Sequence, residues 1–251
     1  MIRLSVNVNK IATVRNSRGG RVPSVLDAVR ACITAGVPGI TVHPRADARH
    51  ITTADVHEVA ALLRELNAER SEDAQVEYNI EGDPRPGLLE LVHAVVPAQC
   101  TLVPVIPGEI TSQAGWPSDT PHSALGSTVS ALRSAGIRVS LFVDPDEGAI
   151  QWASNLGADR VELYTEPFAR AFERGPGAAQ ASFERYVRAA ELAHSLRLGI
   201  NAGHDLDLEN LVLFRRLPHL DEVSIGHAVV SHALFVGLER SVREYLDVLA
   251  G

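Results

Sequence analysis

The chain has 251 residues, 45% of them hydrophobic, which is enough for a sizeable core, and we expect residues 1–251 to form one domain. It contains no apolar run long enough for a membrane span, and its first residues resemble a strand rather than a secretory signal. The net charge of −8 argues against a nucleic-acid partner. Cys32 and Cys100 lie too far apart to indicate a disulfide framework or a zinc knuckle. We therefore expect a soluble, cytoplasmic protein.

Basic residues concentrate near the N-terminus. Residues 1–50 contain eight Lys or Arg and two Asp or Glu, whereas the remaining residues carry a net charge of −14. Lys10 is the only lysine in the chain. Anion binding is therefore expected to be local.

Short β-branched runs alternate with helical patterns along the chain. Eight strands are predicted at residues 4–9, 39–43, 76–81, 101–106, 138–144, 160–165, 198–202 and 222–226. Helical patterns follow them near 23–35, 53–68, 86–96, 122–135, 146–156, 178–196, 207–216 and 228–249. Eight such pairs in a chain of this length predict an α/β fold, a closed (β/α)₈ TIM barrel. An open doubly wound sheet would usually carry a GxGxxG fingerprint, which this chain lacks.

The predicted strands alternate apolar and polar residues, so one face should meet the helices and the other the barrel interior. The inward polar residues are Ser5, Asn7, Asn9, Thr41, His43, Asn79, Glu81, Ser140, Asp144 and Glu162. They concentrate near the carboxyl ends of the strands, where barrel enzymes build their active sites. We therefore expect an active site at that mouth.

Two further patterns point to anion binding. The loop after His43 contains Arg45, Arg49 and His50, which favour a phosphate or carboxylate; a solvated basic loop beside a core histidine is the alternative. Gly-His pairs at 203–204 and 226–227 each end a strand and enter a helix, which suits a phosphate, although each could be a turn with a capping histidine.

The titratable residues near the mouth could serve a metal or proton transfer. They are His43, His50, Glu81, Glu162, His204 and His227. We favour proton transfer, because metal hydrolases of this fold often have an HxH pair where this chain has Asn7-Val8-Asn9, and because nearby arginines repel a cation. Several proton-transfer groups suit a condensation with dehydrations.

Two connections are long for this fold. Residues 107–121 could form a lid over a ligand or pack against a neighbouring subunit. Residues 166–177 are the second long connection.

Several sequence motifs, spread over nearly the whole chain, are specific when they are taken together. They lie at residues 7–19, 40–45, 49–52, 79–81, 109–111, 139–144, 201–204 and 225–227. Together they resemble the pyridoxine 5′-phosphate synthase family. The resemblance implies a barrel that joins 1-deoxy-D-xylulose 5-phosphate to 3-amino-2-oxopropyl phosphate, forming pyridoxine 5′-phosphate and releasing phosphate and water. It implies no metal and no organic cofactor.

The resemblance also implies roles for individual residues. His43 and Glu81 would accept protons and His204 would donate one. The substrate-binding residues would be Asn7, Asn9, Lys10, Arg18, Arg45, His50, Thr111, Glu162, Asp205, Gly226 and His227. Members of the family form homo-oligomers, often octamers, in which Arg18 would reach a neighbouring subunit's site.

The chain departs from the family pattern at two points of the mouth. Many members have Asp-His where this chain has Asn9-Lys10, and a glycine is common at the position of Asp205. Lys10 could pair with a substrate phosphate. A Schiff base on Lys10 is the testable alternative, since the family's imine forms between the two substrates.

Two other functions remain open. One is another phosphosugar lyase or isomerase on the same barrel. The other is a non-catalytic barrel that binds a phosphorylated ligand, although binding alone does not require His43, Glu81 and His204 together.

Overall fold

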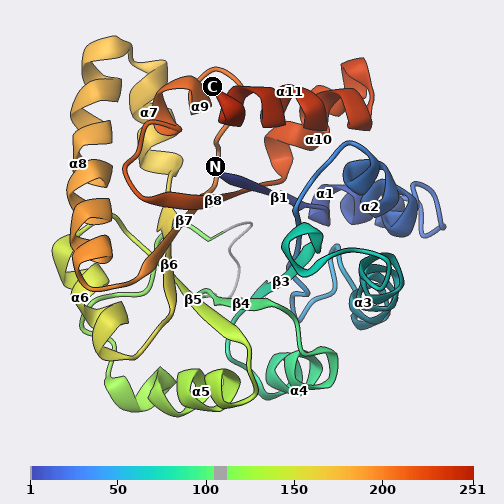
Figure 1. Ribbon diagram of the computed structural model, residues 1–251, viewed down its shortest axis with the longest axis horizontal. Coiled ribbons are helices and arrows are strands. Elements are labelled where there is room, and N and C mark those ends of the chain that lie inside the picture. The colour runs from blue at the N-terminus through green and yellow to red at the C-terminus, as the bar shows by residue number, and fades with distance from the viewer. Residues whose placement is uncertain (1, 105–111) are drawn as a thin grey trace.

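The computed structural model describes residues 2–104 and 112–251, which form a closed barrel of eight parallel strands (Figure 1). Each strand pairs with the next, and β8 pairs with β1. The strands are β1 (Arg3–Asn7), β2 (Gly39–Val42), β3 (Glu77–Gly82), β4 (Gln99–Leu102), β5 (Arg138–Val143), β6 (Arg160–Tyr164), β7 (Gly199–Gly203) and β8 (Leu220–Ile225). The predicted (β/α)₈ barrel is confirmed.

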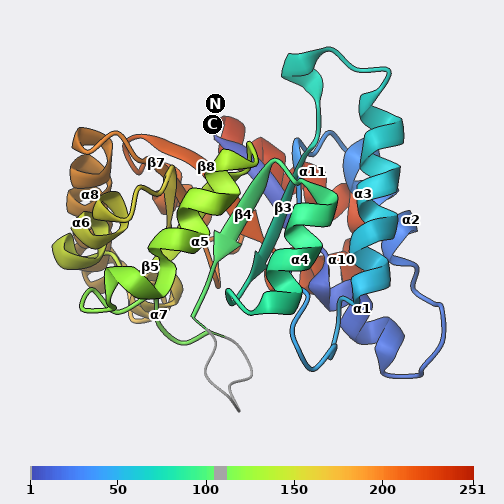
Figure 2. The same ribbon diagram turned by 90° about the horizontal axis from the view of Figure 1, so that it is seen from below.

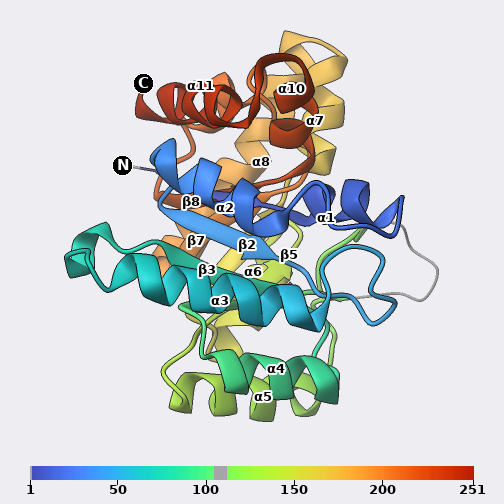
Figure 3. The same ribbon diagram turned by 90° about the vertical axis from the view of Figure 1, so that its right-hand side faces the viewer.

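Helices surround the barrel. They are α1 (Asn9–Asn16), α2 (Val25–Thr34), α3 (Thr53–Asn67), α4 (Pro86–Val95), α5 (His122–Ser134), α6 (Glu147–Asn155), α7 (Glu166–Glu173), α8 (Pro176–Ser195), α9 (Leu211–Phe214), α10 (His227–Val236) and α11 (Leu238–Ala250), with a short 3₁₀ turn at Glu72–Ala74. Figure 2 shows α4 and α5 on the outside of the strands, and Figure 3 shows α1, α2 and α3 together on one side of the barrel. Among the helices of these ranges, none combines the length and apolar character that crossing a membrane requires.

The strand parity is as predicted. Leu4, Val6 and Ile40 point outward and are fully buried in the main hydrophobic cluster between strands and helices. Burial of this apolar surface is the main force that holds the helices against the barrel.

The barrel interior contains a layer of hydrogen-bonded polar side chains. Ser5 and Thr41 share a hydrogen bond of 2.7 Å between their hydroxyl oxygens, and Asn79 Nδ2 donates to Thr41 Oγ1 at 3.3 Å. Thr101 Oγ1 donates to Asn79 Oδ1 at 3.0 Å. These bonds tie β1, β2, β3 and β4 together below the mouth. The next inward residues are Asn7, His43 and Glu81.

Several predicted elements differ in the structure. The fourth strand, predicted at 101–106, spans Gln99–Leu102, and the helix predicted at 207–216 spans Leu211–Phe214. The first strand was predicted to reach residue 9, but it ends at Asn7, whose Oδ1 accepts the Asn9 N–H at 3.0 Å, and α1 begins there. The predicted connection 166–177 contains a helix, α7, instead of a loop. The single helix predicted at 228–249 is two helices separated by Gly237, whose φ of 88° lies in the left-handed region.

The predicted lid at 107–121 is described from residue 112 onward. Trp116 anchors this part to the barrel, because its indole N–H donates to Leu102 O and its backbone N–H to Phe142 O, both at 2.9 Å. Residues 112–121 are therefore fixed to the ends of β4 and β5.

Candidate active site

A cavity of about 420 Å³ opens at the carboxyl ends of the strands. Of the fourteen residues predicted for the site, twelve line it, namely Asn7, Asn9, Lys10, His43, Arg45, His50, Glu81, Glu162, His204, Asp205, Gly226 and His227. The closed barrel brings together residues that are up to 220 positions apart in the chain. Thr111, also predicted for the site, lies outside the described residues.

Several lining residues were not predicted. Thr13 lies on α1, a helix that the strand pattern concealed, and Ser112 follows the undescribed segment. Ser224 was detectable, because it is an inward-facing position of β8 two residues before Gly226. Leu206 and Ile225 add apolar surface to the same cavity.

His43 and Glu81 face each other across the ends of β2 and β3. His43 Nδ1 lies 3.8 Å from Glu81 Oε2, and the His43 backbone N–H donates to Asn9 Oδ1 at 2.9 Å. Among the described residues, His43 Nε2 is buried without a hydrogen-bond partner. A buried donor or acceptor without a partner is costly, so this nitrogen is suited to a bound ligand.

Two other side chains hold the Glu81 carboxyl. Asn7 Nδ2 donates to Oε2 at 3.3 Å, and the Ser224 hydroxyl donates to Oε1 at 3.5 Å. These contacts come from β1 and β8, so two further strands hold the carboxyl in place.

Burial shifts the pKa values of His43 and Glu81 so that the neutral form of each group is favoured. It lowers the pKa of His43 to about 3, with His50 and Arg45 adding to the effect. Burial also raises the pKa of Glu81, and the charge of Glu222 raises it further, against the hydrogen bond from Ser224. A neutral imidazole thus faces a carboxyl that can exchange a proton near neutral pH.

Glu162, on β6, lines the same cavity as this pair. It is 4% exposed, and its pKa is raised well above the usual value by burial, then by the charges of Glu81 and Glu222. A Cβ on Gly203 would lie 2.8 Å from Glu162 Oε1. The same Cβ would lie 2.9 Å from the backbone O of Ser224, which cannot move aside, and this contact explains the glycine.

The loop after β2 supplies groups for an anion. His50 Nδ1 accepts the Ile51 N–H at 2.9 Å, so the neutral ring carries its proton on Nε2 and can donate it to a ligand. Its pKa is lowered to about 4 by burial, then by the charges of Arg45 and Lys10, which also line the cavity.

The corner from β8 to α10 supplies a second set of donors. Val230 N–H makes the bond to Gly226 O, so the amides of residues 227–229 precede the regular hydrogen bonds of α10. A Cβ on Gly226 would lie 2.8 Å from Asn7 O, which explains the glycine. Free amides at a helix start favour a phosphate.

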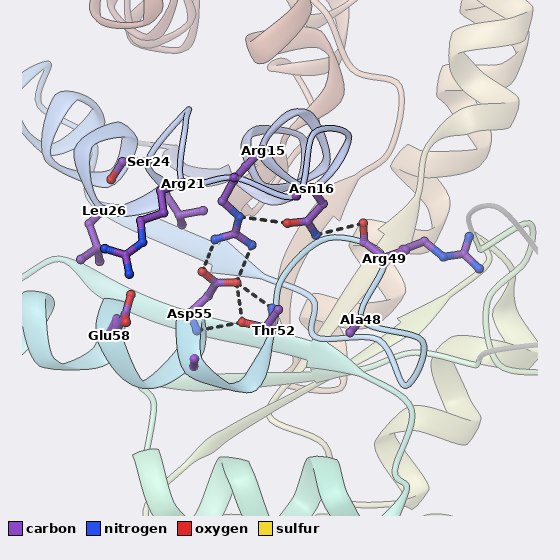
Figure 4. Close-up of a pocket in the computed structure, with 14 residues that line it drawn as sticks. Arg15, Asn16, Arg21, Ser24, Leu26, Ala48, Arg49, Thr52, Asp55 and Glu58 are labelled. Atoms are coloured by element: carbon purple, nitrogen blue, oxygen red, sulfur yellow. Dashed lines mark hydrogen bonds and ion pairs between the residues drawn. The ribbon is translucent and has the colours of Figure 1, made fainter.

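A larger cavity of about 990 Å³ lies outside the barrel beside α2 and α3 (Figure 4). Its main buried charges are already paired, because Arg15 forms an ion pair with Asp55, which also closes the capping box with Thr52 at the start of α3. Gly19 and Arg21, in the loop between α1 and α2, also line this cavity. It offers no cluster of proton-transfer groups.

Arg18 is exposed and does not line the mouth cavity of its own chain. The structure therefore separates Arg18 from the other predicted site residues. In residues 2–104 and 112–251, no three His, Cys, Asp or Glu side chains are grouped so that they could hold a metal ion.

Comparison with solved structures supports the architecture. The chain superimposes on a thiamine phosphate pyrophosphorylase from Pyrococcus furiosus with a TM-score of 0.62 at 14% identity, covering 99% of this chain and 96% of that one. A tryptophan synthase from M. tuberculosis gives a TM-score of 0.61 at 13% identity, covering 99% and 93%. At these identities the likeness concerns the fold alone.

Comparison of sequences is more specific. Residues 4–251 match the family model described as pyridoxal phosphate biosynthesis protein PdxJ. Proteins named pyridoxine 5′-phosphate synthase are 49% identical in Bacteroides fragilis, covering 99% of this chain and all of that protein, and 50% identical in Leptospira biflexa, covering 100% and 98%. With a cavity lined by the family's motif residues and identity near one half over the full length, the chain belongs to the PdxJ family of pyridoxal phosphate biosynthesis proteins.

Proposed function

We propose that the chain is a pyridoxine 5′-phosphate synthase that condenses 1-deoxy-D-xylulose 5-phosphate with 3-amino-2-oxopropyl phosphate, releasing phosphate and water. The observation that carries this proposal is the meeting of His43, Glu81 and His204 in one cavity. Two separate sets of anion-binding groups border the same cavity, one after β2 and one at the start of α10. Two phosphorylated substrates require two such sets.

The proton-transfer roles follow from the environment of each group. His43 is neutral and has an unpartnered Nε2, which suits a proton acceptor. Glu81 is the second acceptor once it is ionised. His204 is the donor: burial lowers its pKa, and a bound phosphate dianion nearby would favour its protonated form.

The two phosphates bind at different corners in this proposal. Arg45, His50 and Thr111 hold the xylulose phosphate, with Lys10 as an additional cation. The aminoketone phosphate is held by Asn7, Asp205 and the backbone amides at Gly226 and His227, with Arg18 from another subunit. Asn9 and Glu162 complete the contacts at the mouth.

We also propose that the chain acts as a cytoplasmic homo-oligomer, with the octamer as the expected size. Leu234 and Phe235 at the end of α10 are 77% and 88% exposed, an apolar surface that a second copy would cover. Arg18 is exposed and can reach a neighbouring subunit. Cys32 and Cys100 are buried free thiols, in keeping with a reducing compartment. Native mass spectrometry of the wild type and of Phe235→Lys tests the assembly: a smaller species is expected for the variant.

The decisive experiment supplies the purified protein with both substrates together and with each alone. Pyridoxine 5′-phosphate and free phosphate should appear only when both are present. Turnover of a single phosphosugar would instead indicate a lyase or isomerase, and binding without turnover would indicate a ligand-binding barrel.

A further inference from the structure

The corner that carries His204 has an unusual backbone. His204 and Asp205 are consecutive non-glycine residues with φ of 83° and 56°. The left-handed region is unfavourable for side chains with a Cβ, so such a pair persists only where the surrounding structure holds it. The turn places the His204 side chain at the cavity.

Buried side chains hold the carbonyl groups of this corner. The single proton of the Thr165 hydroxyl is shared between Gly203 O and His204 O, and the Thr165 backbone N–H donates to Gly203 O at 3.0 Å. Asn210 Nδ2 donates to Asp205 O at 3.0 Å. Three successive carbonyls at residues 203–205 thus have side-chain donors.

The Thr165 hydroxyl forms its hydrogen bonds with this corner and not with the helix that follows Thr165 in the chain. It occupies the N-cap position of α7, where a threonine side chain usually accepts a hydrogen bond from a backbone N–H of the first turn, yet it makes no such bond. It is fully buried. Its hydroxyl crosses from the end of β6 to the end of β7.

The residue before Thr165 contacts the His204 ring directly. The ring centroids of Tyr164 and His204 are 5.4 Å apart, and those of Phe142 and His204 are 5.3 Å apart. Phe142 and Tyr164 form a small apolar cluster with Val103, separate from the main core. The Tyr186 hydroxyl donates a hydrogen bond to Tyr164 O at 2.7 Å and so holds this apolar cluster in place.

We propose that Thr165 is a positioning residue that holds the left-handed His204-Asp205 corner through the carbonyls of Gly203 and His204, so that the His204 imidazole stays against Phe142 and Tyr164 and faces the substrates. This inference rests on the proposed function, in which His204 donates a proton. Thr165 itself acts through the backbone and touches no substrate. Without its hydroxyl, the corner relaxes and the ring gains contact with water.

The test compares Thr165→Val, which removes the hydroxyl at nearly constant volume, with Thr165→Ser, which keeps it. The matched control is Tyr78→Phe, which also removes one buried hydroxyl that donates to a backbone carbonyl, here Val56 O at 3.3 Å. The titration of His204 is followed by NMR of ¹³C-labelled histidine, assigned with His204→Gln, alongside kcat and both KM values.

Thr165→Val should lower kcat at least tenfold with KM changed less than threefold, and the pKa of His204 should rise toward its ordinary value. Burial is the cause that lowers this pKa in the wild type. Thr165→Ser and Tyr78→Phe should keep the wild-type kcat and His204 titration. Wild-type kcat and titration in Thr165→Val would overturn the proposal.

Asn210→Ala provides a second variant, because it removes the hydrogen bond to the Asp205 carbonyl, together with the one that Asn210 Oδ1 accepts from the Asp207 N–H. A smaller change in the same direction is expected. If Thr165→Val does not fold, Thr165→Ala, which also removes the hydroxyl, takes its place, and an unchanged His204 titration in that variant overturns the proposal. The NMR measurement requires no turnover. A wild-type protein without synthase activity would therefore refute the proposed function, whereas an unperturbed His204 would refute the positioning role.

Discussion

Nδ1 of His43 lies 3.8 Å from Oε2 of Glu81, which is carried by the neighbouring strand of the barrel. Burial favours the uncharged form of both groups. Loss of one proton from the Glu81 carboxyl therefore takes the pair from neutral to charged. A group that changes protonation near the working pH is what repeated proton transfers require.

Replacement of Glu81 by Gln should lower kcat by about 100-fold or more, the usual contribution of a general acid or base. The amide keeps the shape, and its one oxygen can accept one of the two hydrogen bonds that Asn7 and Ser224 donate to different carboxyl oxygens, but it cannot take up a proton. Calorimetry with inorganic phosphate should show binding close to that of the wild type. Full synthase activity in this variant would remove the assigned role of Glu81.

The pH dependence of kcat should have a rising limb set by Glu81. Because burial and then the charge of Glu222 raise the pKa of this carboxyl, its accepting form increases only as the pH rises through that elevated value. Glu222→Gln removes the neighbouring charge, so the rising limb should move to lower pH. Rate profiles of the two proteins measure the shift, and an unchanged or opposite shift would contradict the assignment.

Lys10→Met should raise the KM of a phosphorylated substrate about tenfold while changing kcat little, since it removes a cation that borders the cavity without removing a proton-transfer group. Borohydride with either substrate alone should leave no adduct on Lys10 by mass spectrometry. An adduct would show that Lys10 forms a Schiff base.

Asp55→Asn should lower the free energy of unfolding by roughly 1.5–3 kcal/mol, because the carboxylate accepts bonds from Arg15 and from Thr52 at the start of α3. Burial opposes ionisation, but these bonds hold the pKa of Asp55 below its ordinary value of 3.8. Its contribution is therefore complete above that value and is lost as the pH falls below it.

Urea denaturation at pH 7 and at pH 3 measures this effect. The control is Glu173→Gln, since Glu173 is 65% exposed and pairs only on the surface of α7 with Arg170. Equal losses in the two variants would show that the Arg15–Asp55 pair is no more important than a surface pair.

The barrel could be predicted because its strands repeat one alternation of apolar and polar residues. The same alternation misled at the first strand, where Val8 continues the pattern of Leu4 and Val6, but Asn7 binds the Asn9 N–H and ends the strand. Helix α7 was hidden in a segment that opens with Glu166-Pro167 and ends before Gly175, residues that also occur in loops.

The titratable residues of the site were detectable from their types and their places at strand ends. The residues that hold these groups in position could not be detected from the sequence. Thr165 is an ordinary residue type at a strand end, and its importance depends on which carbonyls it meets in three dimensions. The left-handed backbone at His204 is equally invisible in a sequence, since neither histidine nor aspartate requires it.

The hydrogen-bonded layer of Ser5, Thr41, Asn79 and Thr101 determines the height at which chemistry occurs in this barrel. Each of the first three side chains stands two residues before a residue of the cavity, so it forms a rigid floor under Asn7, His43 or Glu81. A slip of one residue in any of these strands would exchange a reactive group for an apolar one. Substitutions in the loops above this layer can therefore change the substrate preference, while the layer keeps the reacting groups in place.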